Sequence, residues 1–256
     1  MILAYDIGNT NIVIGCIDNG KILFTERVST NHSATELEYA VSLKAVTDLY
    51  GISPDKIEGA IISSVVPSVT VTVKKAIHKI TGKNALIVGP GIKTGLSIII
   101  DNPAQLGSDL VVDAVAGISE YPAPMIIFDL GTATTVSVID KSKNYIGGMI
   151  IPGMVVSLES LSGRTSQLPH INLEPPKKLI GSNTVDCMKS GILYGTASSM
   201  DGIIQRIREE KGEDFTVIAT GGLASSVVPL CREKIILDDN LLLKGLEIIY
   251  NKNCRV

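Results

Sequence analysis

Cysteine is scarce in this chain, and its spacing excludes the sites that cysteine commonly builds. The 256 residues include only 4 cysteines, Cys16, Cys187, Cys231 and Cys254, and they stand far apart. No C-x-x-C pair occurs, and none of the four is near a histidine. Zinc sites and disulfide frameworks need closely spaced ligand pairs or a dense set of cysteines. The sequence therefore predicts neither a zinc site nor a disulfide framework.

Long apolar runs and blocks of like charge are also missing. No segment approaches the roughly 18 apolar residues of a membrane span, and no basic region precedes an apolar stretch at the N-terminus. The 23 Lys and Arg residues nearly balance the 26 Asp and Glu residues, for a formal net charge of -3. These features argue against a membrane or a nucleic acid as partner. We expect a soluble, cytoplasmic protein.

What the sequence does contain is an alternation of apolar strands and helix-like stretches. With 45% hydrophobic and 19% charged residues, the chain is typical of a globular protein of one large or two modest domains. Strands are predicted at 1–7, 11–17, 20–28, 59–66, 84–89, 125–130, 135–140, 216–222 and 234–237. Helices are predicted at about 34–50, 68–82, 103–120, 155–162, 184–211 and 240–252. This order indicates an α/β protein with mixed sheets.

One pattern occurs twice. "ILAYDIGNTNIVIGCID" at 2–18 and "MIIFDLGTATTVSVID" at 125–140 each hold an apolar strand, then D-x-G with threonines or asparagines, then a second apolar strand. A weaker repeat relates 58–69 to 214–225, where a β-rich run ends in a turn of small residues. Recurrence at about half the chain length predicts two related halves.

The D-x-G pattern suits a loop that holds phosphate. Glycine lets the backbone turn and approach a ligand closely, and the following N–H, Thr and Asn groups can donate to phosphate oxygens. A carboxylate repels phosphate, so its sensible partner is Mg²⁺ carried by a nucleotide. Two such loops facing each other would hold a metal-bound polyphosphate from both sides. The simpler interpretation, ordinary turn chemistry, suits a single copy better than a repeated one.

These motifs resemble the phosphate and adenosine motifs of the acetate/sugar kinase, Hsp70 and actin superfamily. Within it, "DIGNTNIVIG", "DNPAQLGSD", "FDLGTATT", "GGMIIPG", "SQLP" and "GSNTVDCMKSG" resemble type III pantothenate kinase over essentially the whole chain. The resemblance implies two duplicated ribonuclease-H-like, actin-like ATPase domains with mixed β-sheets and a nucleotide cleft between them. We place these domains at 1–116 and 117–256, with the C-terminal helix able to pack back on the first.

The resemblance also implies an activity. Members of this family transfer the γ-phosphate of ATP to pantothenate, which is the first step of coenzyme A biosynthesis. They use Mg²⁺ and a monovalent cation, K⁺ or NH₄⁺, and they are cytoplasmic homodimers.

Carried over by residue, the resemblance predicts the nucleotide site. The first phosphate loop is Asp6, Ile7, Gly8, Asn9, Thr10, Asn11, Ile12 and Val13. Asp6 is directed at Mg²⁺, Thr132 of the second loop meets the nucleotide, and Asp129 helps to hold the monovalent cation. Gly221 and Gly222 leave room for the adenosine, although an ordinary strand-to-helix turn explains them equally well from the residues alone.

The resemblance makes Asp109 the general base toward the primary hydroxyl of pantothenate. Such a base acts as the attacking oxygen bonds to phosphorus. A carboxylate after Gly-Ser is also typical of a helix N-cap, and the two roles are compatible. The predicted substrate residues are Ile100, Gly107, Ser108, Asp109, Leu110 and Thr184.

Two of these substrate residues depart from the family pattern. Leu110 stands where the usual G-A-D-R motif has an arginine that contacts substrate, and Ile100 stands where the family has tyrosine. These departures leave three alternatives for the acceptor: pantothenate bound weakly, pantothenate bound differently, or a substrate other than pantothenate.

The segment 181–207 reads as a long helix capped by Ser182 or Asn183. Its small residues recur every three to four positions and form a stripe, which consists of Gly191, Gly195, Ser198, Ser199 and Gly202. A neighbour within the chain would explain this stripe. The resemblance favours a dimer interface, with Thr184 reaching into the pantothenate pocket of the partner.

Three hypotheses follow. The first is a pantothenate kinase. The second is another activity of the same fold, either a kinase for a different hydroxylated acceptor or an actin-like ATPase. The third, motivated by Leu110 and Ile100, is a non-catalytic, nucleotide-binding regulatory protein.

Overall fold

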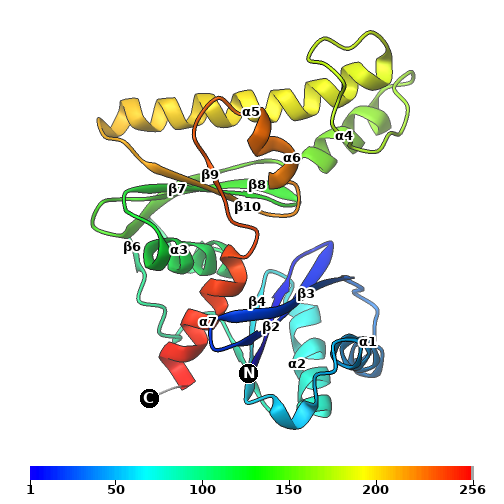
Figure 1. Cartoon of the computed structure of the whole chain (residues 1–256), viewed down its shortest axis with the longest axis vertical. Helices are drawn as coiled ribbons and strands as arrows, with labels where there is room; N and C mark the ends of the chain where they lie inside the picture. The colour runs from blue at the N-terminus through cyan, green and yellow to red at the C-terminus, as the bar shows by residue number, and fades with distance from the viewer. Residues whose placement is uncertain (255–256) are drawn as a thin grey trace. The chain divides into compact units, whose positions relative to one another are not determined.

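The computed structural model describes residues 1–254, and these form two compact units (Figure 1). The first unit holds Met1–Leu96, Asp101–Ser119 and the chain from Asn240 onward. The second holds Ser97–Ile100 and Glu120–Asp239. The predicted domain boundary at residue 116 stays a prediction.

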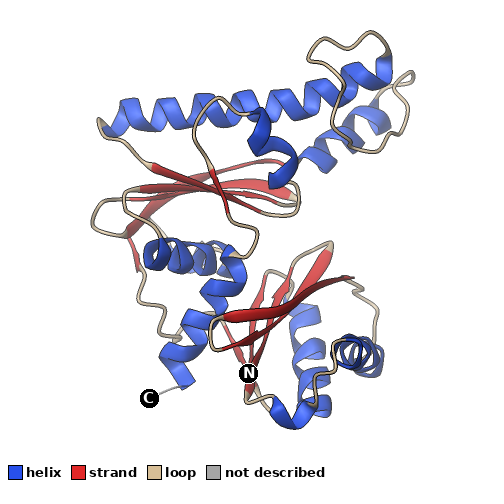
Figure 2. Cartoon of the chain, in the orientation of Figure 1, coloured by secondary structure: helices blue, strands red, loops and turns tan. Residues whose placement is uncertain are grey.

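The first unit is a five-stranded sheet with helices (Figure 2). Its strands are β1 (Ile2–Ile7), β2 (Asn11–Asp18), β3 (Lys21–Ser29), β4 (Gly59–Ser64) and β5 (Ala85–Ile87), in the order β3-β2-β1-β4-β5. Its helices are α1 (Glu36–Leu49), α2 (Pro67–Thr81), α3 (Ser108–Glu120) and α7 (Leu241–Cys254), with short 3₁₀ turns at Pro54–Lys56 and Pro103–Gln105. The apolar runs of the sequence become β1 and β4, which pair in parallel and are almost fully buried.

The second unit repeats this plan. Its strands are β6 (Ser97–Ile98), β7 (Met125–Leu130), β8 (Ala133–Ile139), β9 (Asn144–Pro152), β10 (Thr216–Thr220) and β11 (Ile236–Leu237), in the order β11-β10-β7-β8-β9-β6. Its helices are α4 (Met154–Arg164), α5 (Thr184–Lys211) and α6 (Ala224–Val227), followed by a 3₁₀ turn at Val228–Leu230. Figure 1 shows α5 lying along one face of this sheet.

When the strand order of the second sheet is reversed, its strands β9-β8-β7-β10-β11 correspond to β3-β2-β1-β4-β5 of the first. β7, β8 and β9 form an antiparallel meander like β1, β2 and β3, and β10 pairs in parallel with β7 as β4 does with β1. Only β6, which pairs in parallel with β9, has no counterpart. The predicted duplication of an α/β fold is confirmed.

Some elements differ from the prediction, and the short β6 and α6 were not predicted at all. No strand was predicted over 144–152, yet β9 lies there as the counterpart of β3. Its pattern is hidden because Gly147 and Gly148 interrupt the run and the apolar Met149 and Ile150 are exposed. The helix predicted from residue 103 begins only at Ser108, because Asn102 caps a separate 3₁₀ turn just before it.

Helix α7 closes the first unit. It contacts β1 and β4, and its residues Leu241, Leu243, Leu246 and Ile249 are buried. Gly245 allows a close approach to α3, since a Cβ at this position would overlap with the backbone carbonyl of Val112. The segment that holds Asp109 is therefore fixed by the C-terminal helix as well as by the sheet.

Candidate active site

The first predicted phosphate loop is the tight turn between β1 and β2. Asp6 lies in β1 just before the turn and is half-buried, between Val13 of β2 and Ser63 of β4 in the register of the sheet. The N–H of Gly8 donates to the carbonyl of Asn11 at 3.0 Å, and this bond closes the turn. A Cβ at Gly8 would stand 3.2 Å from that same oxygen. The three residues at the tip and its end, Asn9, Thr10 and Asn11, are exposed.

Helix α3 begins beside this loop and is fastened to the end of β4 by serines. The Ser108 hydroxyl donates to the carbonyl of Ser64 and accepts from the Ser64 N–H, both at 3.0 Å. It also lies 3.1 Å from the hydroxyl of Ser63, a fully buried residue paired with Asp6. Side chains at paired positions of parallel strands point to the same face of a sheet. Asp6 and the start of α3 therefore lie on one face at the ends of β1 and β4.

Asp109 is the second residue of α3 and is half-buried. Its Oδ1 accepts from the N–H of Leu110 at 2.9 Å, and the side chain lies so close to Gly107 that a Cβ there would overlap with it. Burial raises the pKa of Asp109 above the ordinary value of an aspartate, while backbone hydrogen bonds oppose this shift in part. A carboxylate with a raised pKa is a stronger proton acceptor than an ordinary one.

The second predicted phosphate loop is the turn between β7 and β8. The N–H of Gly131 donates to the carbonyl of Ala133 at 3.1 Å, and Thr132 at the tip is exposed. Asp129 is half-buried and lies between Thr135 of β8 and Thr220 of β10, as Asp6 lies between Val13 and Ser63. The two D-x-G motifs thus occupy equivalent places in the two sheets.

Gly221 holds the end of β10 against the second loop. Its φ of +95° lies in the left-handed region that favours glycine, and a Cβ would stand 2.6 Å from the N–H nitrogen of Leu130 and overlap with the Asp129 carboxylate. The next residue, Gly222, is exposed. Gly153 approaches the same loop from the start of α4, where a Cβ would overlap with the carbonyl of Thr132.

The structure groups the predicted residues by unit. In the first unit the phosphate loop, Gly107, Ser108, Asp109 and Leu110 are linked through Ser63 and Ser64. In the second unit Asp129, Thr132 and Gly221 come together. Ile100, half-buried, follows the edge strand β6, and Thr184, exposed, is the first residue of α5, so neither belongs to the group around Asp129. Asn183, one of the two predicted caps, caps α5 by accepting from the Asp186 N–H at 2.9 Å.

Sequence reasoning missed several residues that shape the loops, among them Ser63, Thr220 and Gly153. Ser63 and Thr220 flank the two aspartates, and Gly153 supports the second loop. The signal for Ser63 and Thr220 was present, because both lie at the polar end of a strand of the weaker repeat, Ser63 next to last in β4 and Thr220 last in β10. Gly153 carried no such signal, since its contact with Thr132 depends on the chain returning through β9.

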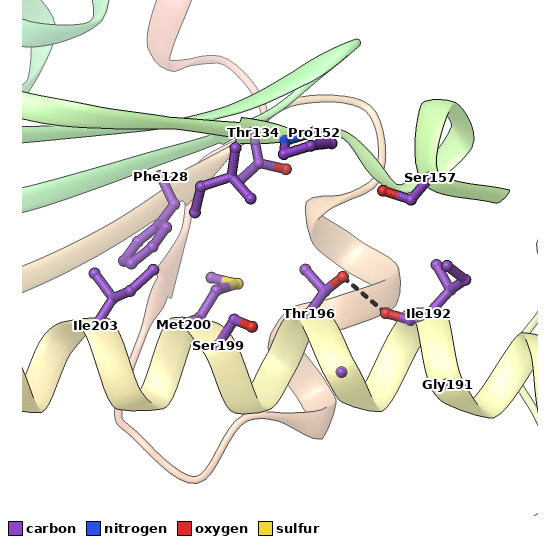
Figure 3. Close-up of a pocket in the computed structure, with 12 residues that line it drawn as sticks. Phe128, Thr134, Pro152, Ser157, Gly191, Ile192, Thr196, Ser199, Met200 and Ile203 are labelled. Carbon is purple, nitrogen blue, oxygen red and sulfur yellow. Dashed lines mark hydrogen bonds between the residues drawn. The ribbon is translucent and has the colours of Figure 1, made fainter. Parts of the chain in front are cut away.

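A cavity of about 220 Å³ lies in the second unit between the sheet and α5 (Figure 3). Phe128, Met200 and Ile203 line one end, and the residues Thr196 and Ser199 of α5 lie along its floor in the view shown. None of its lining residues belongs to the predicted site. Phe128 and Asp129 are consecutive in β7 and therefore point to opposite faces of the sheet, so the cavity lies on the face away from Asp129.

Neither a protein-only metal cluster nor a membrane span was found in the described part of the chain. Within residues 1–254, no three His, Cys, Asp or Glu side chains come together in a way that could hold a metal ion. The same residues include no helix with the length and apolar character needed to cross a membrane.

Comparisons with known proteins agree on one family. A family model described as type III pantothenate kinase matches residues 2–206. The type III pantothenate kinase of Bacillus cytotoxicus is 43% identical over 253 residues, covering 99% of this chain and 97% of the relative. That of an Exiguobacterium species is also 43% identical over 253 residues, covering 99% of both chains.

A solved structure extends the fold likeness beyond this family. The (R)-2-hydroxyglutaryl-CoA dehydratase component A of Acidaminococcus fermentans has a TM-score of 0.56 to this chain at 13% identity, and the match covers 97% of this chain and 96% of the other. A likeness at so low an identity shows the fold alone. It confirms the predicted fold class, the actin-like ATPase and sugar kinase fold.

Proposed function

This chain belongs to the type III pantothenate kinase family, and we propose that it transfers the γ-phosphate of ATP to pantothenate, the first step of coenzyme A biosynthesis. The observation that carries this proposal is 43% identity, over 99% of this chain, to relatives of that name. Both D-x-G motifs are present in the sequence. The local geometry supports it, because each loop is a tight turn whose exposed tip follows a half-buried aspartate.

We assign Asp109 as the general base. The hydroxyl of pantothenate would pass its proton to the carboxylate while its oxygen bonds to the γ-phosphorus, and the bond from that phosphorus to the bridging oxygen of ATP would break to release ADP. Phosphoryl transfer depends mainly on positioning and charge stabilisation, so a carboxylate of moderately raised basicity is sufficient. The Ser108 contacts and the packing of α7 keep this residue in place.

We assign Asp6 to Mg²⁺ and Asp129 to a monovalent cation, K⁺ or NH₄⁺. Mg²⁺ prefers oxygen ligands and is commonly held by one or two carboxylates together with substrate phosphates, which fits the single Asp6 carboxylate beside the loop. When bound, these cations would neutralise negative charge on the phosphates. Gly221 leaves room for the Asp129 carboxylate, because a Cβ at this position would overlap with its Oδ1.

The predicted acceptor site departs from the family pattern at two positions. Leu110 stands in place of an arginine that contacts substrate in the family pattern, and Ile100 stands in place of a tyrosine, so we expect the arginine's contact to be missing here. One charge-assisted hydrogen bond contributes roughly 1.5 to 3 kcal/mol, or about ten- to a hundredfold in affinity. These two residues favour a second candidate, a kinase of the same mechanism for another hydroxylated acceptor.

We further propose a homodimer formed through the second unit. Its β9, α4 and the residues leading into α5 expose large apolar side chains, namely Met149, Ile150, Val155, Val156, Leu161, Leu179, Ile180 and Val185. Gly191, Gly195 and Ser199 of the small-residue stripe line the cavity between the sheet and α5, so the proposed interface rests on these apolar side chains and not on the stripe. Exposed apolar surface of this extent is typical of protein interfaces. The exposed Thr184 at the start of α5 is available to reach a partner's substrate.

We place the reaction in the cytoplasm. All four cysteines are free thiols in the structure, although Cys187 and Cys254 are exposed. Free cysteines are typical of a reducing compartment.

The proposed function is tested by following ADP release from purified protein with Mg²⁺ and ATP. We expect ADP release only after pantothenate is added. Asp109→Asn serves as the control, because it removes the base and leaves both phosphate loops unchanged. Release of ADP without an acceptor, or equal rates in the variant, would contradict the assignment.

A further inference from the structure

The first phosphate loop is held by a residue that lies outside it. Thr30 directly follows β3 and is half-buried. Its hydroxyl donates to the carbonyl of Gly8 at 2.7 Å, and its backbone N–H donates to the carbonyl of Thr10 at 2.9 Å. One residue therefore binds two of the peptide units that form the turn.

These two bonds set the direction of two N–H groups. A trans peptide unit is planar, and its C=O and N–H point in opposite directions. Because the Gly8 carbonyl points at Thr30, the N–H of Asn9 in the same peptide unit points away from it. The Thr10 carbonyl fixes the N–H of Asn11 in the same manner. Asn9 and Asn11 are both exposed residues of the turn, so a ligand can approach the turn at these two positions.

Thr30 is itself held by helix α1. The next residue, Asn31, is bound twice by Tyr39 of α1: the Tyr39 hydroxyl accepts from the Asn31 N–H and donates to the Asn31 carbonyl, both at 2.9 Å. Tyr39 is only 4% exposed. The side chain of Asn31 accepts from the N–H of Ser33 at 2.9 Å, and Thr35 and Glu38 form a capping box at the start of α1. The segment that carries Thr30 is thus tied to the core of the first unit.

We propose that Thr30 is a positioning residue of the nucleotide site, which turns the N–H groups of Asn9 and Asn11 toward the phosphate oxygens of ATP. This inference rests on the proposed function. The carbonyls of Gly8 and Thr10 would repel phosphate if the turn rotated, and the two bonds to Thr30 keep them on the opposite side. Thr30 acts through the loop and needs no contact with the nucleotide.

The test compares two substitutions that differ by one hydroxyl. Thr30→Val keeps the branched shape and the backbone N–H but removes the bond to Gly8, whereas Thr30→Ser keeps that bond. Thr25→Val is the matched control, because Thr25 is exposed on the same strand and pairs with Gly15, away from the turn. Binding of Mg²⁺-ADP to the full chain is measured by calorimetry without any acceptor, and turnover is measured over a range of ATP concentrations.

We expect Thr30→Val to weaken Mg²⁺-ADP binding by about five- to tenfold, the effect of one lost hydrogen bond. Thr30→Ser and Thr25→Val should stay within about twofold of the unmodified chain. The Thr30→Val change should raise the KM for ATP more than it lowers kcat, because the chemical groups at Asp109 are untouched. If Thr30 had only a structural role, Thr30→Val would lower the melting temperature without raising the KM for ATP more than it lowers kcat. Thr30→Ser would then not bind Mg²⁺-ADP more tightly than Thr30→Val.

Several results would overturn the inference. If the unmodified chain binds Mg²⁺-ADP and Thr30→Val binds it equally well, the positioning role is wrong while the proposed function stands. If Thr30→Ser is as weak as Thr30→Val, the hydroxyl is not the group that matters. If the unmodified chain does not bind Mg²⁺-ADP, the proposed function fails and the inference with it. Should Thr30→Val not fold, Thr30→Ala provides the same comparison with serine.

Discussion

The hydroxyl of Ser63 lies 3.1 Å from the hydroxyl of Ser108, and this contact joins the strand beside Asp6 to the helix that carries Asp109. Ser63 is fully buried, so each hydroxyl depends on the other and on nearby backbone groups for its hydrogen bonds. Removing one partner of a buried hydrogen bond lowers the free energy of unfolding more than expected from the bond alone, because the other polar group stays buried without a partner. Removing both partners together avoids this penalty.

Ser108→Ala should therefore destabilise the chain by about 1 to 2 kcal/mol, because it leaves the Ser63 hydroxyl and the Ser64 N–H without their bonds. Ser63→Ala combined with Ser108→Ala should cost less than the sum of the two single changes. Urea unfolding followed by circular dichroism gives the three free energies. Ser68→Ala, at an exposed position of α2, is the control. Strict additivity of the two changes would show that the hydroxyls do not interact.

The raised pKa of Asp109 has a consequence for stability. Because burial raises the pKa in the folded state above that of the unfolded chain, the carboxyl favours folding at low pH, and this contribution is lost as pH rises through the folded pKa. Asp109→Asn removes the charge, so the variant should be more stable than the unmodified chain at neutral pH. The difference should shrink as pH falls below the ordinary range of an aspartate. Melting temperatures across this range check the sign, and a variant that is less stable at every pH would contradict it.

The same substitution separates stability from catalysis. Asp109→Asn should abolish phosphorylation and leave ATP binding nearly unchanged, since the phosphate loops are untouched. In the unmodified enzyme, the acidic limb of the kcat/KM profile, which reports the free enzyme, should lie at a higher pH than the ordinary pKa of an aspartate. An acidic limb at or below that ordinary pKa would argue against Asp109 as the titrating base.

The proposed homodimer makes a prediction about Ile150. This residue is 78% exposed on β9, among the apolar side chains assigned to the interface. Ile150→Asp should dissociate the dimer, because a charge would be buried against apolar surface. Leu49→Asp, at a residue 76% exposed on α1 of the first unit, should leave the dimer intact. Analytical ultracentrifugation distinguishes the two, and a dimer that survives Ile150→Asp would place the interface elsewhere.

Leu110 offers a test of the acceptor site. Leu110→Arg should lower the KM for pantothenate by about tenfold, because a planar guanidinium can donate to substrate oxygens where leucine cannot. The KM for ATP should change much less. Adding Ile100→Tyr should increase the effect, although neighbouring sites need not be additive. If the double variant binds pantothenate no better, the site is built for another acceptor or another residue already supplies the contact.

The duplicated architecture was readable from the sequence because it depends on local pattern. The buried strands β1 and β7 are apolar runs that lead into a D-x-G turn. The repeat therefore predicts where the two turns lie and which chemical groups they carry. Strand β9 escaped detection because its two glycines and its exposed Met149 and Ile150 lack the pattern of a half-buried strand. We assign these exposed apolar residues to the proposed dimer interface. The hydrophobic periodicity of a single chain does not predict where a partner binds.

The contacts that hold the first loop and the start of α3 in place could not be predicted from the sequence. Thr30 reaches Gly8 only because β3 ends beside the turn between β1 and β2, and Ser108 reaches Ser63 only because α3 starts at the end of β4. Both contacts depend on strand register and on chain segments that are distant in sequence. A motif in the sequence predicts a residue such as Asp109. The residues that hold Asp109 in place can be identified only from the folded structure.

The central claim is that this chain phosphorylates pantothenate, and the most direct measurement is a comparison of acceptors. Purified protein with Mg²⁺, K⁺ and ATP is given pantothenate and a panel of other hydroxylated acids, and kcat/KM is determined for each from the phosphorylated product. The account predicts that pantothenate has the highest kcat/KM and that product formation accounts for all ADP released. A different acceptor with a higher value, or ADP release with no phosphorylated acceptor, would contradict it.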